Sequence, residues 1–181
     1  MKTRPSAEYA VLGALASGPK HGYEILQLLE QSLGSTWYVG QSQLYSLLKR
    51  LERDGLVLSN VESQEGRPSK RVFSLTPLGR DTFMRWVVTP TEHVRDLRIE
   101  FLAKLFFIHH LSLQGGDSLL EAQIGVLEQA KEKIIQRNLK ETDPYEKLVL
   151  DFKLTTLEAW LGWLKGEASV FINKICHVID A

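Results

Sequence analysis

The chain has 181 residues, 44% of them hydrophobic and 24% charged, which is typical of a folded globular protein and excludes a disordered chain. The formal net charge is zero, yet residues 1–85 carry 11 Lys and Arg against 8 Asp and Glu, a modest basic excess. The single cysteine, Cys176, excludes an internal disulfide, and no apolar run reaches the ~18 residues of a membrane span. We therefore expect a cytoplasmic protein with no membrane contact.

Two helices are expected first, one from Ser6 to about Gly18 and one from about Lys20 to Leu33. The start of the second helix carries two polar side chains, those of Lys20 and His21. Both could approach a phosphate group there, because a helix N-terminus presents unpaired N–H groups. A plain capping role is the alternative for His21.

A third helix is expected over residues 42–53, with one apolar and one polar face. Its leucines recur at i, i+3, i+4 and i+7, so they form one stripe that faces a core. The other face is basic and polar, as contacts to phosphates and base edges require. The candidate DNA-binding residues in this region are Gln41, Ser42, Gln43, Tyr45, Ser46, Lys49 and Arg50. For Tyr45 the alternative is packing between this helix and the next segment.

After Gly55 the hydrophobic period changes from about 3.6 to about 2, which predicts a β-hairpin. Its connection contains Gly66. Polar and basic residues lie at or beside the tip, where packing does not require cations and where they can contact phosphate or the minor groove. They are Arg67, Ser69, Lys70 and Arg71. Thr76 then caps a fourth helix, from Pro77 to about Val88.

Several of these pieces resemble a family signature. They are Gly18–Ile25, Leu44-Tyr45, Leu48–Glu52, Gly55–Val57, Gly66–Pro68 and Ser74–Thr76. Together they are similar to the winged-helix motif of the PadR family of bacterial transcriptional regulators. The resemblance implies a winged helix-turn-helix DNA-binding domain over residues 1–88. In such a domain the third helix enters the major groove and the hairpin contacts adjacent backbone or minor groove.

Only helical periods follow a linker at Thr89–Thr91, so we expect an all-helical domain over residues 92–181. Residues 100–107 also resemble the carboxy-terminal region of shorter PadR-type proteins, including the virulence-activator group. A further helix should be capped by Asp117 or Ser118, and a long last helix should run from Pro144 to about Val178.

The last helix carries more apolar side chains than a helix pair can cover, so the amino-terminal domain or a second subunit must bury some of them. We expect a homodimer that uses this surface. The candidate interface residues are Leu157, Trp160, Leu161, Trp163, Leu164 and Phe171.

No catalytic, metal or cofactor constellation is recognisable. His109 and His110 are adjacent and point about 100° apart on a helix, and Cys176-His177 has no second cysteine beside it. There is no Gly-rich phosphate loop and no nucleophile motif. We therefore expect neither an enzyme nor a bound metal or cofactor.

The expected fold class is mainly α with a small β-hairpin: a winged helix-turn-helix domain followed by a helical dimerisation domain. The expected function is sequence-specific regulation of transcription by a homodimer on a pseudo-palindromic operator in double-stranded DNA, with repression favoured over activation. The resemblance implies that a small hydrophobic or phenolic effector can act on such a protein. The alternative is a winged-helix protein-interaction module without its own operator, against which the basic outer face of the third helix argues.

Overall fold

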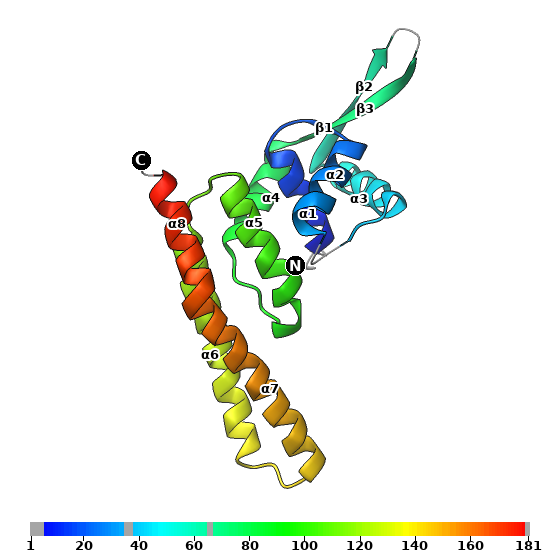
Figure 1. The fold of residues 1–181 in the computed structure, drawn as a ribbon. Helices are drawn as coiled ribbons and strands as arrows, with labels where there is room; N and C mark the ends of the chain where they lie inside the picture. Colours follow the sequence, from blue (N-terminus) through cyan, green and yellow to red (C-terminus); the bar gives the residue numbers. More distant parts are fainter. Residues whose placement is uncertain (1–5, 35–37, 65–66, 180–181) are drawn as a thin grey trace. The chain divides into compact units, whose positions relative to one another are not determined.

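The computed structural model (Figure 1) describes residues 6–34, 38–64 and 67–179. The chain forms two compact units, each built from two stretches of sequence. The first unit comprises Met1–Val87 and Arg98–Leu111, and the second comprises Val88–Leu97 and Ser112–Ala181. Neither unit is therefore a continuous piece of sequence.

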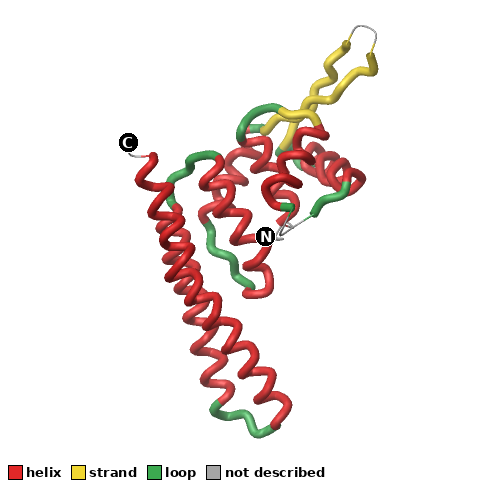
Figure 2. The backbone as a smooth tube through the Cα atoms, viewed as in Figure 1, coloured by secondary structure: helices red, strands yellow, loops and turns green. Residues whose placement is uncertain are grey.

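The first unit combines helices with a small antiparallel sheet. Its helices are α1 (Ser6–Ala16), α2 (Gly22–Leu33), α3 (Gln41–Arg53), α4 (Pro77–Val88) and α5 (Leu102–His110), the last preceded by the π-helical turn η2 (Leu97–Phe101). Its strands are β1 (Lys20–His21), β2 (Val57–Gln64) and β3 (Arg67–Leu75), in the order β1-β3-β2. The hairpin of β2 and β3, here called the wing, extends beyond the helices (Figure 2). This confirms the predicted winged helix-turn-helix.

The ends of α3 and α4 meet as the sequence predicted. Gly55 follows α3 with φ +71°, a conformation that glycine adopts without strain, and the N–H of Leu56 donates to the carbonyl of Leu51 over 2.9 Å. The Thr76 hydroxyl accepts from the N–H of Gly79 over 2.9 Å and donates to the carbonyl of Gly55 over 2.8 Å. One threonine thus caps α4 and ties it to the end of α3.

The start of the second helix differs from the prediction. A helix was expected from about Lys20, whereas α2 begins at Gly22. Lys20 instead lies opposite Phe73 in the sheet, as part of β1. His21 is the N-cap of α2, and its backbone N–H donates to Oε2 of Glu24 over 2.6 Å. A strand of two residues has no period to detect, so only its distant partner β3 defines it.

Helix α5 packs inside the first unit. The ring of Phe107 lies edge-on to Phe83 of α4, with 5.5 Å between centroids, and it covers Gly13 of α1 so closely that a Cβ at that position would lie 2.6 Å from the ring. Tyr9 stacks on Trp86 at 4.9 Å. The expected division into 1–88 and 92–181 therefore differs from the observed one, because the apolar face of α5 is buried by α1 and α4.

The second unit is helical. It contains the short 3₁₀ turn η1 (Val94–Asp96), α6 (Gly116–Asn138), α7 (Pro144–Trp163), the π-helical turn η3 (Leu164–Ala168) and α8 (Ser169–Ile179). Helix α6 packs against α7, η3 and α8. The linker at Thr91 is fixed by a buried side chain: Thr91 N–H donates to Oε1 of Gln123 over 2.6 Å, and Nε2 of Gln123 donates to the Thr91 carbonyl over 3.0 Å.

The helices α6 and α7 of the second unit are capped in different ways. Helix α7 begins at Pro144 as predicted, and its N-cap is Asp143, whose Oδ1 accepts from the N–H of Glu146 over 2.9 Å. The prediction that Asp117 or Ser118 caps α6 was wrong, because the N-cap is Gly115 with φ +93°. A left-handed backbone at this point is open to glycine, so the N-cap lies two residues before Asp117 and three before Ser118.

Candidate nucleic-acid interface

Helix α3 separates its side chains into a buried and an exposed face. The four leucines are at most 5% exposed, as their spacing predicted. Six of the candidate DNA-binding residues on α3 are exposed: Gln41, Ser42, Gln43, Tyr45, Ser46 and Lys49. Ser46 also donates a hydrogen bond from Oγ to the carbonyl of Ser42 over 3.0 Å, which fixes its hydroxyl along the helix. We call the exposed side of α3 the reading face.

Arg50 lies on one flank of α3 and turns towards α1. Its Nε pairs with Oε1 of Glu8, a carboxylate buried by the first unit. Arg50 was predicted as a DNA contact, whereas in the structure it forms an intramolecular ion pair. This ion pair could not be predicted from the sequence, because the two residues are far apart in the chain.

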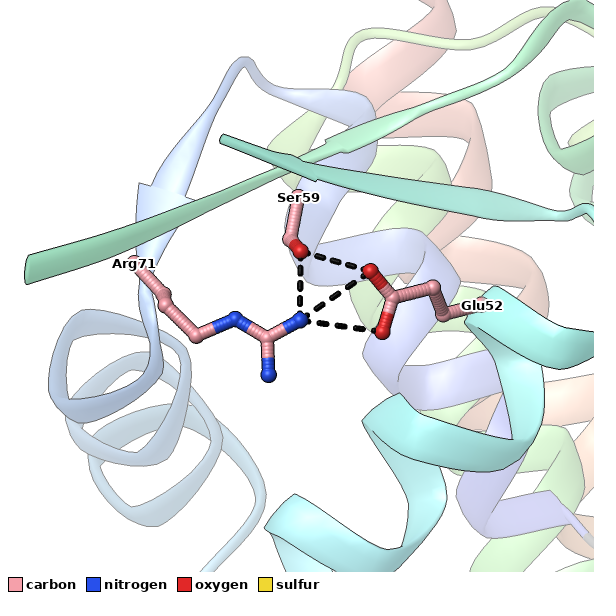
Figure 3. Close-up of polar contacts among 3 residues, drawn as sticks. All are labelled: Glu52, Ser59 and Arg71. Atoms are coloured by element: carbon pink, nitrogen blue, oxygen red, sulfur yellow. Dashed lines mark hydrogen bonds and ion pairs between the residues drawn. The ribbon is translucent and has the colours of Figure 1, made fainter. Parts of the chain in front are cut away.

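Arg71 lies at the base of the wing and faces the other flank of α3. Its Nη2 donates to Oε1 and Oε2 of Glu52 over 3.1 and 3.0 Å and to Oγ of Ser59 over 2.5 Å (Figure 3). Ser59 in turn donates to Oε1 of Glu52 over 2.6 Å. The hydrogen bond from Ser59, together with the charge and hydrogen bond of Arg71, lowers the pKa of Glu52 from its usual value, although partial burial acts in the opposite direction.

Lys70 lies one residue earlier in β3 and approaches the start of α2. Its Nζ is 5.8 Å from the centre of the Tyr23 ring, which also stacks on His21 with 5.7 Å between ring centroids. Tyr23 is 56% exposed. It was not among the predicted site residues, because an aromatic residue in an amphipathic helix normally indicates core. Tyr23 therefore joins the candidate surface as a residue that sequence reasoning missed.

The two residues predicted to approach a phosphate at the start of α2 are partly buried by the protein itself. Lys20 and His21 are both half-buried. Besides capping α2, His21 places Nδ1 3.2 Å from the carbonyl oxygen of Arg71 in the wing. The capping alternative for His21 is thus what the structure contains, and a phosphate contact by Lys20 stays a prediction.

Tyr45 is 45% exposed at the edge of the reading face. A Cβ at Gly22 would lie 2.6 Å from its Oη, so the phenol rests against the start of α2. The wing residues Arg67 and Ser69 belong to β3 by their backbone, but their side chains, and the whole of Gly66, lie outside the described residues.

The residues predicted for a dimer interface divide into two groups. Leu157, Leu161 and Leu164 are at most 8% exposed within the second unit itself, so they belong to its core, in contrast to the expected role. Trp160 and Trp163 are half-buried and lie edge to face with 5.7 Å between centroids, and Phe171 is 37% exposed.

A second apolar stripe runs along the other side of α7. Tyr145, Leu148 and Phe152 are 70%, 65% and 72% exposed and recur at i, i+3 and i+7. Trp163 continues the same side at i+18. We call Tyr145, Leu148 and Phe152 the outer face of α7.

Two other kinds of site were sought. Among the residues that the structure describes, no three His, Cys, Asp or Glu side chains gather as they would around a metal ion. Within the same residues, no helix has the length and apolar character needed to cross a bilayer.

A winged helix-turn-helix whose recognition helix presents Ser, Gln and Lys beside a wing defines the class of duplex-DNA readers. The comparisons with known families agree with this class. Residues 11–85 match the transcriptional regulator PadR-like family, and residues 97–167 match the carboxy-terminal family called virulence activator alpha C-term. Residues 11–85 therefore form a PadR-like domain, and the similarity is to transcriptional regulators and not to enzymes.

Two curated relatives are similar to the chain in part. The negative transcriptional regulator PadR of Bacillus subtilis is 30% identical over 117 residues, which are 65% of this chain and 64% of that protein. A "probable transcriptional regulator" of Mycobacterium tuberculosis is 30% identical over 87 residues, 48% of this chain and 46% of that protein. The chain thus spans less than two thirds of the length of these relatives.

Solved structures of low identity are similar along most of the chain. The Bacillus subtilis PadR complex with operator DNA has a TM-score of 0.48 and 24% identity, and the similarity covers 92% of this chain and 99% of that one. The same protein in complex with p-coumaric acid has a TM-score of 0.42 at 24% identity, with the same coverage of both chains. The protein smu.1604c from Streptococcus mutans has a TM-score of 0.45 and 23% identity, covering 90% and 98%.

Proposed function

We propose that this protein is a sequence-specific transcriptional repressor that binds a pseudo-palindromic operator in double-stranded DNA as a homodimer. The observation that carries the proposal is the reading face of α3, whose side chains are polar or basic while the leucines opposite are buried. A protein-interaction module would present apolar residues there, so this face supports DNA over the alternative. The name of the Bacillus subtilis relative, a negative regulator, supports repression over activation.

In the proposed docking, α3 lies in the major groove. Gln43 and Ser46 are suited to base edges because amides and hydroxyls both donate and accept hydrogen bonds. Lys49 and Lys70 are exposed cations on α3 and on the wing, and they are suited to phosphates on either side of the groove. The chromosome of a bacterial cell lies in the cytoplasm, so the proposed DNA binding takes place there.

The outer face of α7 supports the homodimer. Three large apolar side chains are exposed on one helical stripe, and a two-fold partner offers an identical surface to cover them. Two linked readers bind two half-sites about one helical turn apart, and the second contact is then intramolecular, which raises affinity by ~10²–10⁴.

The similarity to the PadR family extends the proposal to a small hydrophobic or phenolic effector that releases the DNA. p-Coumaric acid is the first compound to test, since PadR of Bacillus subtilis has been crystallised with it. We expect it to raise the melting temperature of the full chain and to weaken duplex binding, and a chain that is indifferent to a panel of phenolic acids contradicts this part of the proposal.

Selection of bound duplexes from a random 40-bp library tests the function as a whole. We expect enrichment of an inverted repeat whose half-sites are about 10 bp apart. Retention of all sequences alike, or of none, contradicts sequence-specific regulation.

A further inference from the structure

The base of the wing is held from both of its faces. Arg71 and Lys70 are consecutive in β3, so their side chains point to opposite sides of the hairpin. Arg71 points to α3, and its Nη2 meets Glu52 of that helix and Ser59 of β2 (Figure 3), whereas Lys70 lies 5.8 Å from the ring of Tyr23 on α2. The Arg71 guanidinium also lies 5.3 Å from the ring of Phe73, which is buried.

We propose that Glu52 and Ser59 are positioning residues for DNA binding, which hold Arg71, and through it the wing, in a fixed direction relative to the recognition helix. The inference rests on the proposed function. Neither residue is suited to touch DNA itself: Glu52 is an anion, and the Ser59 hydroxyl is committed to Glu52 and Arg71.

The presence of a carboxylate here requires a reason. Glu52 belongs to α3, where it follows Lys49 by three residues and so lies on a neighbouring part of the same face, and its negative charge repels phosphates. A partly exposed ion pair also contributes little to folding stability. Pre-organisation of the wing explains why a carboxylate stands at this position, because a wing already directed along the groove loses less conformational freedom when it binds.

Arg71 can be held and still reach outward. Glu52 and Ser59 both bind the same nitrogen, Nη2, and Figure 3 shows the other terminal nitrogen directed away from them. The side chain is 51% exposed. A guanidinium has five N–H donors, so one edge can be fixed by the protein while another meets a phosphate.

Two roles are conceivable for Glu52, and they predict opposite changes in DNA affinity when Glu52 is substituted. If Glu52 only masks the charge of Arg71, Glu52→Gln removes a negative charge, frees a cation and tightens DNA binding. If Glu52 positions the wing, the same variant weakens binding in spite of the more favourable charge. We expect a weakening of about two- to tenfold, the size of one lost charge-assisted hydrogen bond.

Binding of the full-length chain to a fluorescent 25-bp duplex of random sequence, at one fixed low salt concentration, measures this effect. Ser59→Ala removes the hydroxyl without a change in charge and should weaken binding in the same direction. Asp54→Asn is the matched control, since it removes a negative charge at the same end of α3, where Asp54 pairs with Arg53. The control should bind as well as the unaltered chain or more tightly.

Hydrogen exchange of the unbound protein supplies the readout for positioning. Glu52→Gln should speed exchange of the amides in β2 and β3 while the exchange of the amides in α1 stays unchanged. A general destabilisation would speed exchange in α1 as well. Should Glu52→Gln fail to fold, Ser59→Ala decides by both measurements.

The outcomes separate the inference from the function on which it rests. If the unaltered chain binds the duplex but Glu52→Gln or a folded Ser59→Ala binds equally well or better, the positioning role is overturned and the proposed function stands. If the unaltered chain binds no duplex, the proposed function is overturned, and the positioning role with it.

Discussion

The hydroxyl of Tyr45 on α3 rests on the backbone of Gly22 at the start of α2, so closely that a methyl group at position 22 would lie 2.6 Å from Oη. This contact joins the two helices of the helix-turn-helix at the edge of the reading face. It depends on the absence of a side chain at position 22.

Gly22→Ala should displace Tyr45, because the end of this half-exposed side chain can move more easily than the backbone of α2. We expect a modest loss of thermal stability and a several-fold loss of duplex affinity. In a Tyr45→Ala background the same glycine substitution should have little further effect, since the clash is gone. Equal effects in both backgrounds would show that Gly22 acts independently of Tyr45.

Lys49→Ala and Lys70→Ala should each weaken binding to all duplex sequences. Every phosphate contact that is lost should reduce the slope of log affinity against log salt by about 0.9. The matched control is Lys133→Ala, which removes an exposed lysine of α6 in the second unit and should leave the slope unchanged. A slope that is the same in all three variants would remove both lysines from the DNA contact.

Arg50→Gln should act on stability more than on DNA. It removes the ion pair between Arg50 and the buried carboxylate of Glu8, and we expect a loss of about 1–3 kcal/mol in the free energy of unfolding, less than for a fully buried pair because Arg50 is 41% exposed. Urea denaturation measures this loss. A stable variant with a reduced salt slope would instead support the DNA contact that the sequence predicted for Arg50.

The contact between Glu52 and Arg71 should be lost only at a pH below the usual carboxyl range. The pKa of Glu52 is lowered in the folded chain, so its contribution to stability is fully present above the usual carboxyl range and is lost as the pH falls through the folded pKa. The stability difference between the unaltered chain and Glu52→Gln should therefore be constant from about pH 6 to pH 8 and should shrink below about pH 4. Thermal melts across this range check the prediction, and a difference that grows on acidification contradicts it.

Phe152→Glu together with Leu148→Glu should convert a dimer into a monomer if the outer face of α7 is the dimer contact. Both side chains are largely exposed, so the folded second unit should tolerate the charges. The control is Lys153→Glu, which changes charge next to Phe152 but points about 100° away on the helix. Sedimentation at micromolar concentration should give a dimer for the unaltered chain and the control only.

The sequence predicted those parts of the fold that depend on local pattern. The leucine period of α3, Gly55 after it and the threonine cap of α4 are all local, and each is observed. Contacts between distant residues were not predictable in this way. The ion pair of Arg50 with Glu8 and the packing of Phe107 on Gly13 arise only when the chain has folded.

The candidate interfaces show the same limit. Helix α7 has two apolar sides, and periodicity does not tell which one its own chain covers, so Leu157, Leu161 and Leu164 were selected although they are buried in the second unit. Tyr23 is a similar example: the helical pattern assigns it to the core, whereas in the structure it is exposed.

The position of α5 has a consequence for how the protein could be divided. The chain passes from the first unit to the second at Val88, returns at Arg98 for the length of α5, and leaves again at Ser112. A protease that cuts the linker between α4 and η1 would sever one of these three passages, and the downstream fragment would still carry α5, whose Phe107 packs on Phe83 and Gly13 of the upstream fragment. The two pieces would stay together as a nicked complex, and a truncation at Val88 would leave Phe83 and Gly13 without the ring that covers them.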